Sequence, residues 1–184
     1  MPVLPDEPDT FPADLFASPP GADGLGWWVA HTRPRQEKAV ARTLAAAGLP
    51  FYLPCRTRRT KVGGRVVPVR VPLFAGYVFV RSTVAEKWRV MASKRVAHLL
   101  TVGDQDRLWA DLRRVRAVLD LGRPVQVEQR LDPGTRVVVR DGPLAGTPGT
   151  VVREAGGFKF IVAVDFIRQG VSVVVDGEWL GVAA

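Results

Sequence analysis

The sequence is poor in the residues that build disulfides and metal sites. Its 184 residues include one cysteine, Cys55, and two histidines, His31 and His98. A single thiol cannot form an intrachain disulfide, which fits a reducing compartment. So few nitrogen and sulfur ligands argue against a zinc site. We therefore expect neither a bound metal nor a cofactor.

The same scarcity argues against an enzyme. Neither histidine has a nucleophile or a carboxylate partner at a spacing that indicates a catalytic arrangement. The glycine-rich run 142–149 lacks the Lys-Ser/Thr ending of a phosphate-binding loop. We expect no catalytic residues, and a protein that acts by binding.

Long apolar runs are also missing. No stretch reaches the length of a membrane helix, and the N-terminus has no basic lead followed by an apolar run. These absences predict a cytoplasmic protein without membrane contact. Residues 1–26 hold five acidic residues and no lysine or arginine, and they are rich in proline and alanine. That composition predicts a disordered acidic tail.

Positive charge is concentrated in one part of the chain. The formal net charge is +8, and residues 27–95 carry 15 lysines and arginines against two acids, Glu37 and Glu86. Such a field favours nucleic acid or an acidic protein surface as a partner. The alternative is a solvated basic face that only maintains solubility.

Hydrophobic periodicity predicts a mixed α and β unit up to residue 121. Strands are predicted over 26–31, 49–61, 66–71, 72–81 and 96–102, and helices over 34–47, 84–94 and 105–120. Gly63 and Gly64 are predicted to close a protruding hairpin, because Pro68 and Pro72 argue against a central strand.

Alternation along the strongest strand predicts which side chains face the helices. Val78 and Val80 are predicted to point toward them, and the opposite face is predicted to carry Tyr77, Phe79 and Arg81. In the helix over 84–94, Trp88 and Met91 are predicted to point into the core.

The last third of the sequence predicts a small β domain after a linker over 122–131. Val137 and Val139 alternate with outward positions, and Gly142, Gly146 and Gly149 supply the turn that follows. Five short strands are predicted over 136–140, 150–154, 158–164, 170–175 and near Trp179. Because the two halves differ in periodicity, we expect two domains.

These motifs resemble the NusG family of transcription elongation factors. The run 132–153 is similar to the KOW motif of a small SH3-like β-barrel, although an ordinary glycine-rich hairpin is the alternative. The first half is similar to the NGN domain through the segments 27–29, 34–38, 51–54 and 72–80. The resemblance implies an α+β fold, with an NGN α/β sandwich over 27–121, an antiparallel sheet with helices, and a KOW barrel over 132–184.

The resemblance also implies a partner. In the family, the NGN domain binds the tip of a coiled coil on the clamp of RNA polymerase and reaches toward the opposite jaw, which supports processive elongation. The positions that match the family's apolar pocket are His31, Phe74, Tyr77 and Phe79. The alternative is that these aromatic side chains belong to the core.

Two further sets of residues gain a role from the resemblance. The nontemplate DNA strand or the upstream duplex is expected to contact Arg33, Arg35, Arg56, Arg58, Arg59, Lys61, Arg65 and Arg70. In general NusG proteins a Phe-Gly-Arg loop of the barrel meets Rho or a ribosomal protein. Here the run Asp165–Gly170 keeps Phe166 and Arg168 in an altered order, which leaves both partners open.

The resemblance therefore implies a monomeric transcription elongation and antitermination factor. The segment 27–54 and the ending 174–180 resemble specialised, operon-directed paralogues of the RfaH type, although the His-Thr-Thr run of RfaH is absent. A general housekeeping NusG, which acts in termination as well, is one alternative. A ribosome-associated or RNA-binding KOW protein is the other.

Overall fold

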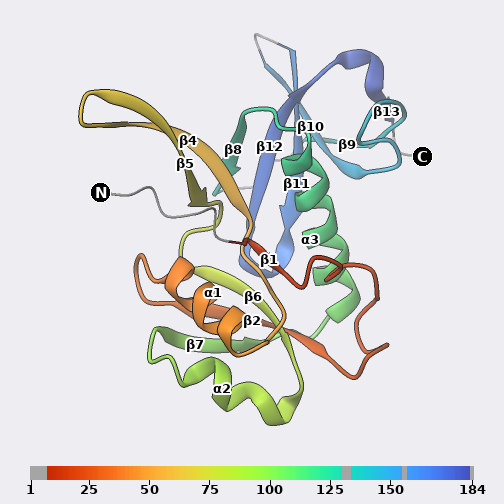
Figure 1. Ribbon diagram of the computed structural model, residues 1–184. Helices are drawn as coiled ribbons and strands as arrows, with labels where there is room; N and C mark the ends of the chain where they lie inside the picture. Colours follow the sequence, from red (N-terminus) through yellow and green to blue (C-terminus); the bar gives the residue numbers. More distant parts are fainter. Residues whose placement is uncertain (1–7, 130–133, 155–156, 183–184) are drawn as a thin grey trace. The chain divides into compact units, whose positions relative to one another are not determined.

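The computed structural model describes residues 8–129, 134–154 and 157–182, in two compact units that divide after Trp109 (Figure 1). The first unit contains a five-stranded antiparallel sheet in the order β1-β3-β6-β2-β7 and a separate two-stranded ribbon. The second contains a six-stranded antiparallel sheet in the order β13-β9-β10-β11-β12-β8. This α+β architecture confirms the predicted fold class.

The elements of the first unit follow the predicted order. The sheet consists of β1 (Thr10–Phe11), β2 (Gly26–Thr32), β3 (Phe51–Tyr52), β6 (Tyr77–Ser82) and β7 (Val96–Thr101). The ribbon is β4 (Cys55–Val62) and β5 (Arg65–Pro72). The helices are α1 (Glu37–Ala46), the 3₁₀ turn η1 (Val84–Glu86), α2 (Lys87–Met91) and α3 (Gln105–Asp120), which continues into the second unit.

One face of the five-stranded sheet packs against α1 and α2. The apolar face of α1 contributes Val40 and Leu44, which are buried in one cluster with Val78 and Val80 of β6. This confirms the direction predicted for the two β6 valines. The opposite face therefore carries the side chains in between, including Tyr77, whose position opposite His31 is fixed by the pairing of β6 with β2.

Residues 8–25 form an ordered segment, which we call the strap. Its strand β1 pairs with β3 at the edge of the sheet, and Leu15 is buried. The ring of Phe16 stacks on Trp27, with centroids 5.7 Å apart, and meets Tyr52 edge-on. The prediction of a disordered tail is therefore wrong for residues 8–25, because isolated apolar side chains anchor this segment to the sheet. The rest of the predicted tail before Pro8 lies outside the described residues.

The second unit is a succession of antiparallel strands. Its elements are β8 (Val125–Glu128), β9 (Thr135–Val139), β10 (Pro148–Glu154), β11 (Gly157–Val164), η2 (Asp165–Ile167), β12 (Gln169–Val175), η3 (Gly177–Trp179) and β13 (Leu180–Val182). Phe160 and Val164 of β11 are fully buried in it. Strand β8 pairs with β12, so the prediction of a linker over 122–131 is wrong for Val125–Glu128. Alternating valines give that short segment a strand's apolar face.

Candidate binding surfaces

Three rings lie side by side on the sheet face opposite α1. His31 is paired in register with Tyr77 of β6 on one side and with His98 of β7 on the other. The ring centroids of His31 and Tyr77 are 5.3 Å apart, and those of His31 and His98 are 6.1 Å apart. His31 and Tyr77 are half-buried and His98 is exposed. We call these three side chains the ring row.

The other two predicted pocket residues lie below the surface. Phe74 is 1% exposed and Phe79 is 0% exposed, and their rings meet edge-on with centroids 6.4 Å apart. The expectation of four open aromatic side chains is therefore corrected to two, His31 and Tyr77. The reason is physical: large apolar rings on a sheet face are buried wherever further segments pack on that face.

A buried carboxylate that sequence reasoning missed positions the ring row. Glu37, at the start of α1, is 7% exposed and its Oε1 accepts the backbone N–H of Gly76 at 2.6 Å. Gly76 has a φ of +83°, and its carbonyl accepts the N–H of Thr32 at 2.8 Å. These bonds hold the turn before Tyr77 against the end of β2. An acid in the first turn of a helix is common, so the sequence alone gave no signal for this role.

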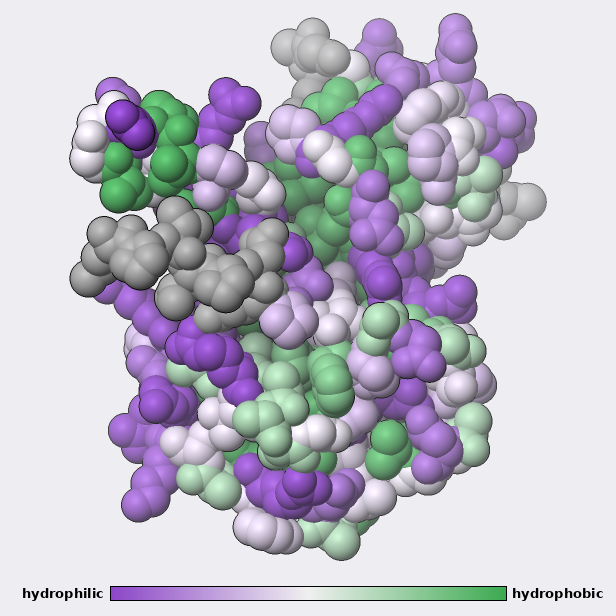
Figure 2. Space-filling model, viewed as in Figure 1, coloured by the Kyte–Doolittle hydropathy of each residue, from purple (hydrophilic) through white to green (hydrophobic). Residues whose placement is uncertain are grey.

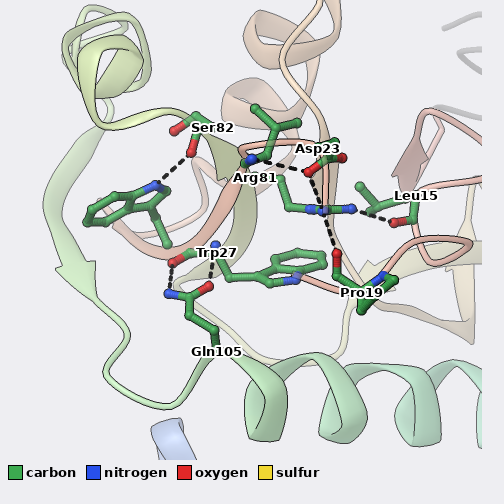
Figure 3. Close-up of polar contacts among 9 residues, drawn as sticks. Leu15, Pro19, Asp23, Trp27, Arg81, Ser82 and Gln105 are labelled. Atoms are coloured by element: carbon green, nitrogen blue, oxygen red, sulfur yellow. Dashed lines mark hydrogen bonds and ion pairs between the residues drawn. The ribbon is translucent and has the colours of Figure 1, made fainter. Parts of the chain in front are cut away.

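A buried arginine fastens the strap to the far end of the same face (Figure 3). Arg81 is 3% exposed, and its guanidinium donates to the carbonyl oxygens of Leu15 and Pro19 at 3.1 and 3.4 Å. It also donates to a carboxylate oxygen of Asp23 at 2.9 Å and lies 5.6 Å from the centre of the Trp27 ring. All three acceptors belong to the strap, so the strap supplies the counter-charge of a buried cation.

The ribbon β4–β5, which we call the hairpin, projects from the rest of the first unit (Figure 1). Its strands are joined at Gly63 and Gly64, with φ of +56° and +81°, as the sequence predicted. Figure 2 shows hydrophilic and hydrophobic side chains together at its outer end, where Lys61 and Arg65 are exposed beside Val62. The predicted nucleic-acid residues Arg58 and Arg59 are exposed too, whereas Arg56 and Arg70 are half-buried, and Arg33 and Arg35 lie exposed before α1.

An exposed apolar patch lies on η1 and α2. Val84, Trp88 and Met91 are 72%, 70% and 38% exposed, and we call them the tryptophan patch. The prediction that Trp88 and Met91 point into the core is wrong, and Val90 takes the buried position. An aromatic side chain this open is a typical anchor of a protein interface.

A capping box fixes the 3₁₀ turn η1, which carries Val84 and leads into α2. The Glu86 carboxylate accepts the backbone N–H and the hydroxyl of Thr83 at 3.2 and 3.0 Å, and Arg89 donates to it at 2.9 Å. The hydrogen bonds from Thr83, and then the neighbouring Arg89, lower the pKa of Glu86 from its ordinary value of 4.5.

Glu86→Gln is expected to reduce the stability of the first unit slightly at neutral pH, by less than about 1 kcal/mol. A carboxyl whose pKa is lowered by folding stabilises the fold above its unfolded pKa and loses that contribution as pH falls through the folded value. The difference between wild type and variant should therefore shrink below pH 4.5, which urea unfolding at several pH values measures. An unchanged difference in acid would contradict the assignment, and Glu178→Gln in the second unit is the control.

The predicted partner residues of the second unit lie on one turn. Phe166 is 37% exposed and Arg168 is exposed, on either side of the buried Ile167 between β11 and β12. Arg168 has a φ of +52°, in the left-handed region. Its side chain and the Phe166 ring are therefore both available to a partner.

The part of the chain that the structure describes contains neither a metal site nor a helix that could span a membrane. Within those residues, no three histidine, cysteine or acidic side chains are grouped so as to hold a metal ion. Among the described helices, none is long and apolar enough to cross a membrane.

Similarity to known proteins decides the family. Residues 25–127, more than half of the chain, match the family model described as "Transcription termination factor nusG". The chain belongs to the NusG family. NusG proteins are transcription factors and not enzymes, so this chain is a transcription factor by family. The matched range begins at residue 25, after most of the strap.

One solved structure supports the fold. A structure concerning domain interaction in Thermotoga maritima NusG matches with a TM-score of 0.51 and 22% identity, over 89% of this chain and 100% of that chain. A chain of the MjSpt4:Spt5 complex matches at 15% identity over 86% of this chain and 97% of that chain, with a TM-score of 0.28. No curated protein matches this chain.

Proposed function

We propose that this NusG-family protein is a transcription elongation factor that binds RNA polymerase through the ring row. The observation that supports this most directly is the pair of half-exposed rings, His31 and Tyr77, beside buried aromatic side chains. Rigid rings over a packed apolar base have the character of an interface hot spot. The proposed occupant is the tip of the clamp coiled coil of the polymerase, and its capture favours processive elongation.

The tryptophan patch is the proposed second contact, toward the opposite jaw of the polymerase. It lies on η1 and α2 and presents one large exposed ring with two aliphatic neighbours. Two separate anchors on one small unit are what a factor that closes a cleft needs. Loss of either anchor then weakens the complex without abolishing it.

The exposed arginines and the lysine of the hairpin, together with Arg33 and Arg35, are the proposed contacts to DNA beside the cleft. Guanidinium groups suit phosphate oxygens, and such contacts fix position and do not read sequence. Phe166 and Arg168 are the proposed partner surface of the second unit, with the ribosome or Rho as candidates. We further propose a cytoplasmic monomer and a specialised paralogue that acts in antitermination at few operons.

The decisive test is direct binding to core RNA polymerase. The full chain, immobilised through a tag, is expected to retain purified bacterial core polymerase. Genome-wide occupancy then separates a general factor, which gives signal on most transcribed genes, from a specialised one, which gives signal at few loci. Failure to bind core polymerase overturns the proposal.

Trp88→Ser is expected to weaken the complex with core polymerase about tenfold, because an exposed tryptophan contributes strongly only where a partner buries it. Equilibrium binding of the full-length variant measures this effect. The matched control is Val174→Ser, which alters another exposed apolar side chain, in the second unit. Equal affinities of wild type and the Trp88 variant would remove the tryptophan patch from the proposed interface.

A second candidate function is RNA binding without polymerase, as in a ribosome-associated KOW protein. The concentration of 15 lysines and arginines in residues 27–95 favours it. Binding to RNA that falls steeply with salt, in the absence of any retained polymerase, would support this alternative.

A further inference from the structure

The strap touches the basic hairpin as well as the sheet. The carboxylate of Asp9 forms an ion pair with the guanidinium of Arg70 in β5. The backbone of the same residue is held separately, because its carbonyl oxygen accepts the N–H of Leu53 at 2.6 Å. The side chain of Asp9 is therefore able to leave Arg70 without detaching the strap from the sheet.

The two ion pairs of the strap differ in strength. The side chains of Arg70 and Asp9 are 37% and 28% exposed, so water and salt screen their attraction. The side chain of Arg81 is only 3% exposed, and it holds the strap by three hydrogen bonds. Arg81 keeps the strap in place, and the contact at Arg70 is the exchangeable one.

Arg70 lies on one face of the hairpin with two other cations. The register pairs Arg70 with Thr57, and alternation then places Arg59 and Lys61 on the same face. Residues 55–72 include no phenylalanine, tyrosine or tryptophan, so this surface has no platform on which bases stack. A two-stranded ribbon also fits a groove of duplex DNA. The ligand that suits this face is the phosphate backbone of a duplex.

We propose that Asp9 is an intramolecular mimic of phosphate, which occupies Arg70 until the hairpin meets duplex DNA. The carboxylate offers Arg70 the charge and the acceptor oxygens of a phosphate. A DNA phosphate displaces the Asp9 carboxylate, so that Arg70 joins Arg59 and Lys61 as a third cation in contact with the duplex. This inference rests on the proposed binding of nucleic acid by the hairpin and adds the regulation of that binding by the strap.

The test compares full-length variants binding a fluorescent DNA duplex of about 20 base pairs, followed by anisotropy over a range of salt concentrations. Asp9→Asn is expected to tighten binding about fivefold at roughly 0.1 M salt and to steepen the salt dependence by about one counterion, since one more phosphate is neutralised. Asp14→Asn is the matched control, because Asp14 is an exposed acid of the same strap. It is expected to change the affinity by less than about twofold.

A double-mutant cycle makes the test specific. In an Arg70→Gln background, Asp9→Asn is expected to have no effect, because the cation that it releases is gone. Equal effects of the Asp9 and Asp14 variants, weaker binding by Asp9→Asn, or an effect that survives Arg70→Gln would each overturn the inference and leave the proposed DNA contacts standing. Absence of duplex binding in all variants would overturn both the inference about Asp9 and the proposed DNA contacts of the hairpin. The proposed role in elongation would then still be tested separately, by the retention of core polymerase. Thermal unfolding of each variant checks that the fold is retained.

Discussion

Replacing His31 and Tyr77 together by alanine is expected to weaken binding to core RNA polymerase by about 100-fold or more. Interface hot spots contribute about 2 kcal/mol or more each on truncation, and about 2.7 kcal/mol corresponds to that factor. The two rings are the half-exposed pair of the predicted pocket, so they are the members that a partner is able to touch directly. Titration of labelled full-length protein with core polymerase measures the change.

Truncating His31 and Tyr77 tests the proposed interface more directly than truncating the buried rings Phe74 and Phe79. Phe79 is fully buried and Phe74 nearly so, and truncating either one removes core packing, with a typical cost of about 3 kcal/mol or more. Lost binding by such a variant would then report unfolding. His31 and Tyr77 have solvent on one side, so the double variant is expected to keep its thermal stability within about 2 kcal/mol of wild type.

The matched control for the ring pair is Phe166→Ala, which truncates an exposed ring of the second unit. It is expected to leave polymerase affinity unchanged if the first unit provides the contact. An equal loss of polymerase affinity in the His31 and Tyr77 variant and in Phe166→Ala would contradict a contact made by the first unit. Unchanged affinity of the His31 and Tyr77 variant would remove the ring row from the proposed interface.

Patterns that depend on near neighbours were predictable from the sequence. The third helix occupies Gln105–Asp120 as its apolar spacing indicated, and the paired glycines 63 and 64 close the hairpin. The inward direction of Val78 and Val80 followed from strand alternation alone. Each of these features is set by local backbone geometry and a continuous apolar stripe.

The missed features depend on distant contacts or on very short elements. A single α-helix over 84–94 predicts that Trp88 points into the core. The segment is instead a three-residue 3₁₀ turn followed by a five-residue helix, and the change from three to 3.6 residues per turn shifts the buried face to Val90. The strap has no hydrophobic periodicity from which its structure could be predicted. Its partner Arg81 lies 66 positions from Leu15, so no local pattern indicates the contact.

In the candidate site, too, the locally determined features were predictable and those that depend on distant contacts were not. Alternation predicted that Tyr77 and Phe79 share a face, and that face is the one on which the ring row lies. Their different exposure was not predictable, because it depends on which remote segments pack over each end of the sheet. The role of Glu37 was hidden for the same reason, since its bond to Gly76 spans 39 positions.

Asp23→Ala is expected to destabilise the first unit by about 2 to 3 kcal/mol, more than Arg81→Met does. Removing the carboxylate leaves a cation that is 3% exposed without its counter-charge, and such a group is costly to retain. Removing the arginine instead leaves a carboxylate that is 41% exposed and is hydrated easily. Asp23 also accepts the N–H of Leu25 at 3.1 Å, so part of its loss is a local turn effect.

A double variant separates the two effects of losing Asp23, which are the unpaired charge of Arg81 and the lost hydrogen bond from Leu25. Arg81→Met in the Asp23→Ala background removes the orphaned cation and fills the site with an apolar chain of similar length, so it is expected to restore about half of the lost stability. Amide exchange in β2 and β6 is the suitable measurement, because those strands report on the first unit alone. Asp14→Ala, an exposed strap acid, is expected to cost less than about 0.5 kcal/mol. A double variant less stable than Asp23→Ala would mean that the hydrogen bonds of Arg81 to Leu15 and Pro19, and not its paired charge, hold the strap on the sheet.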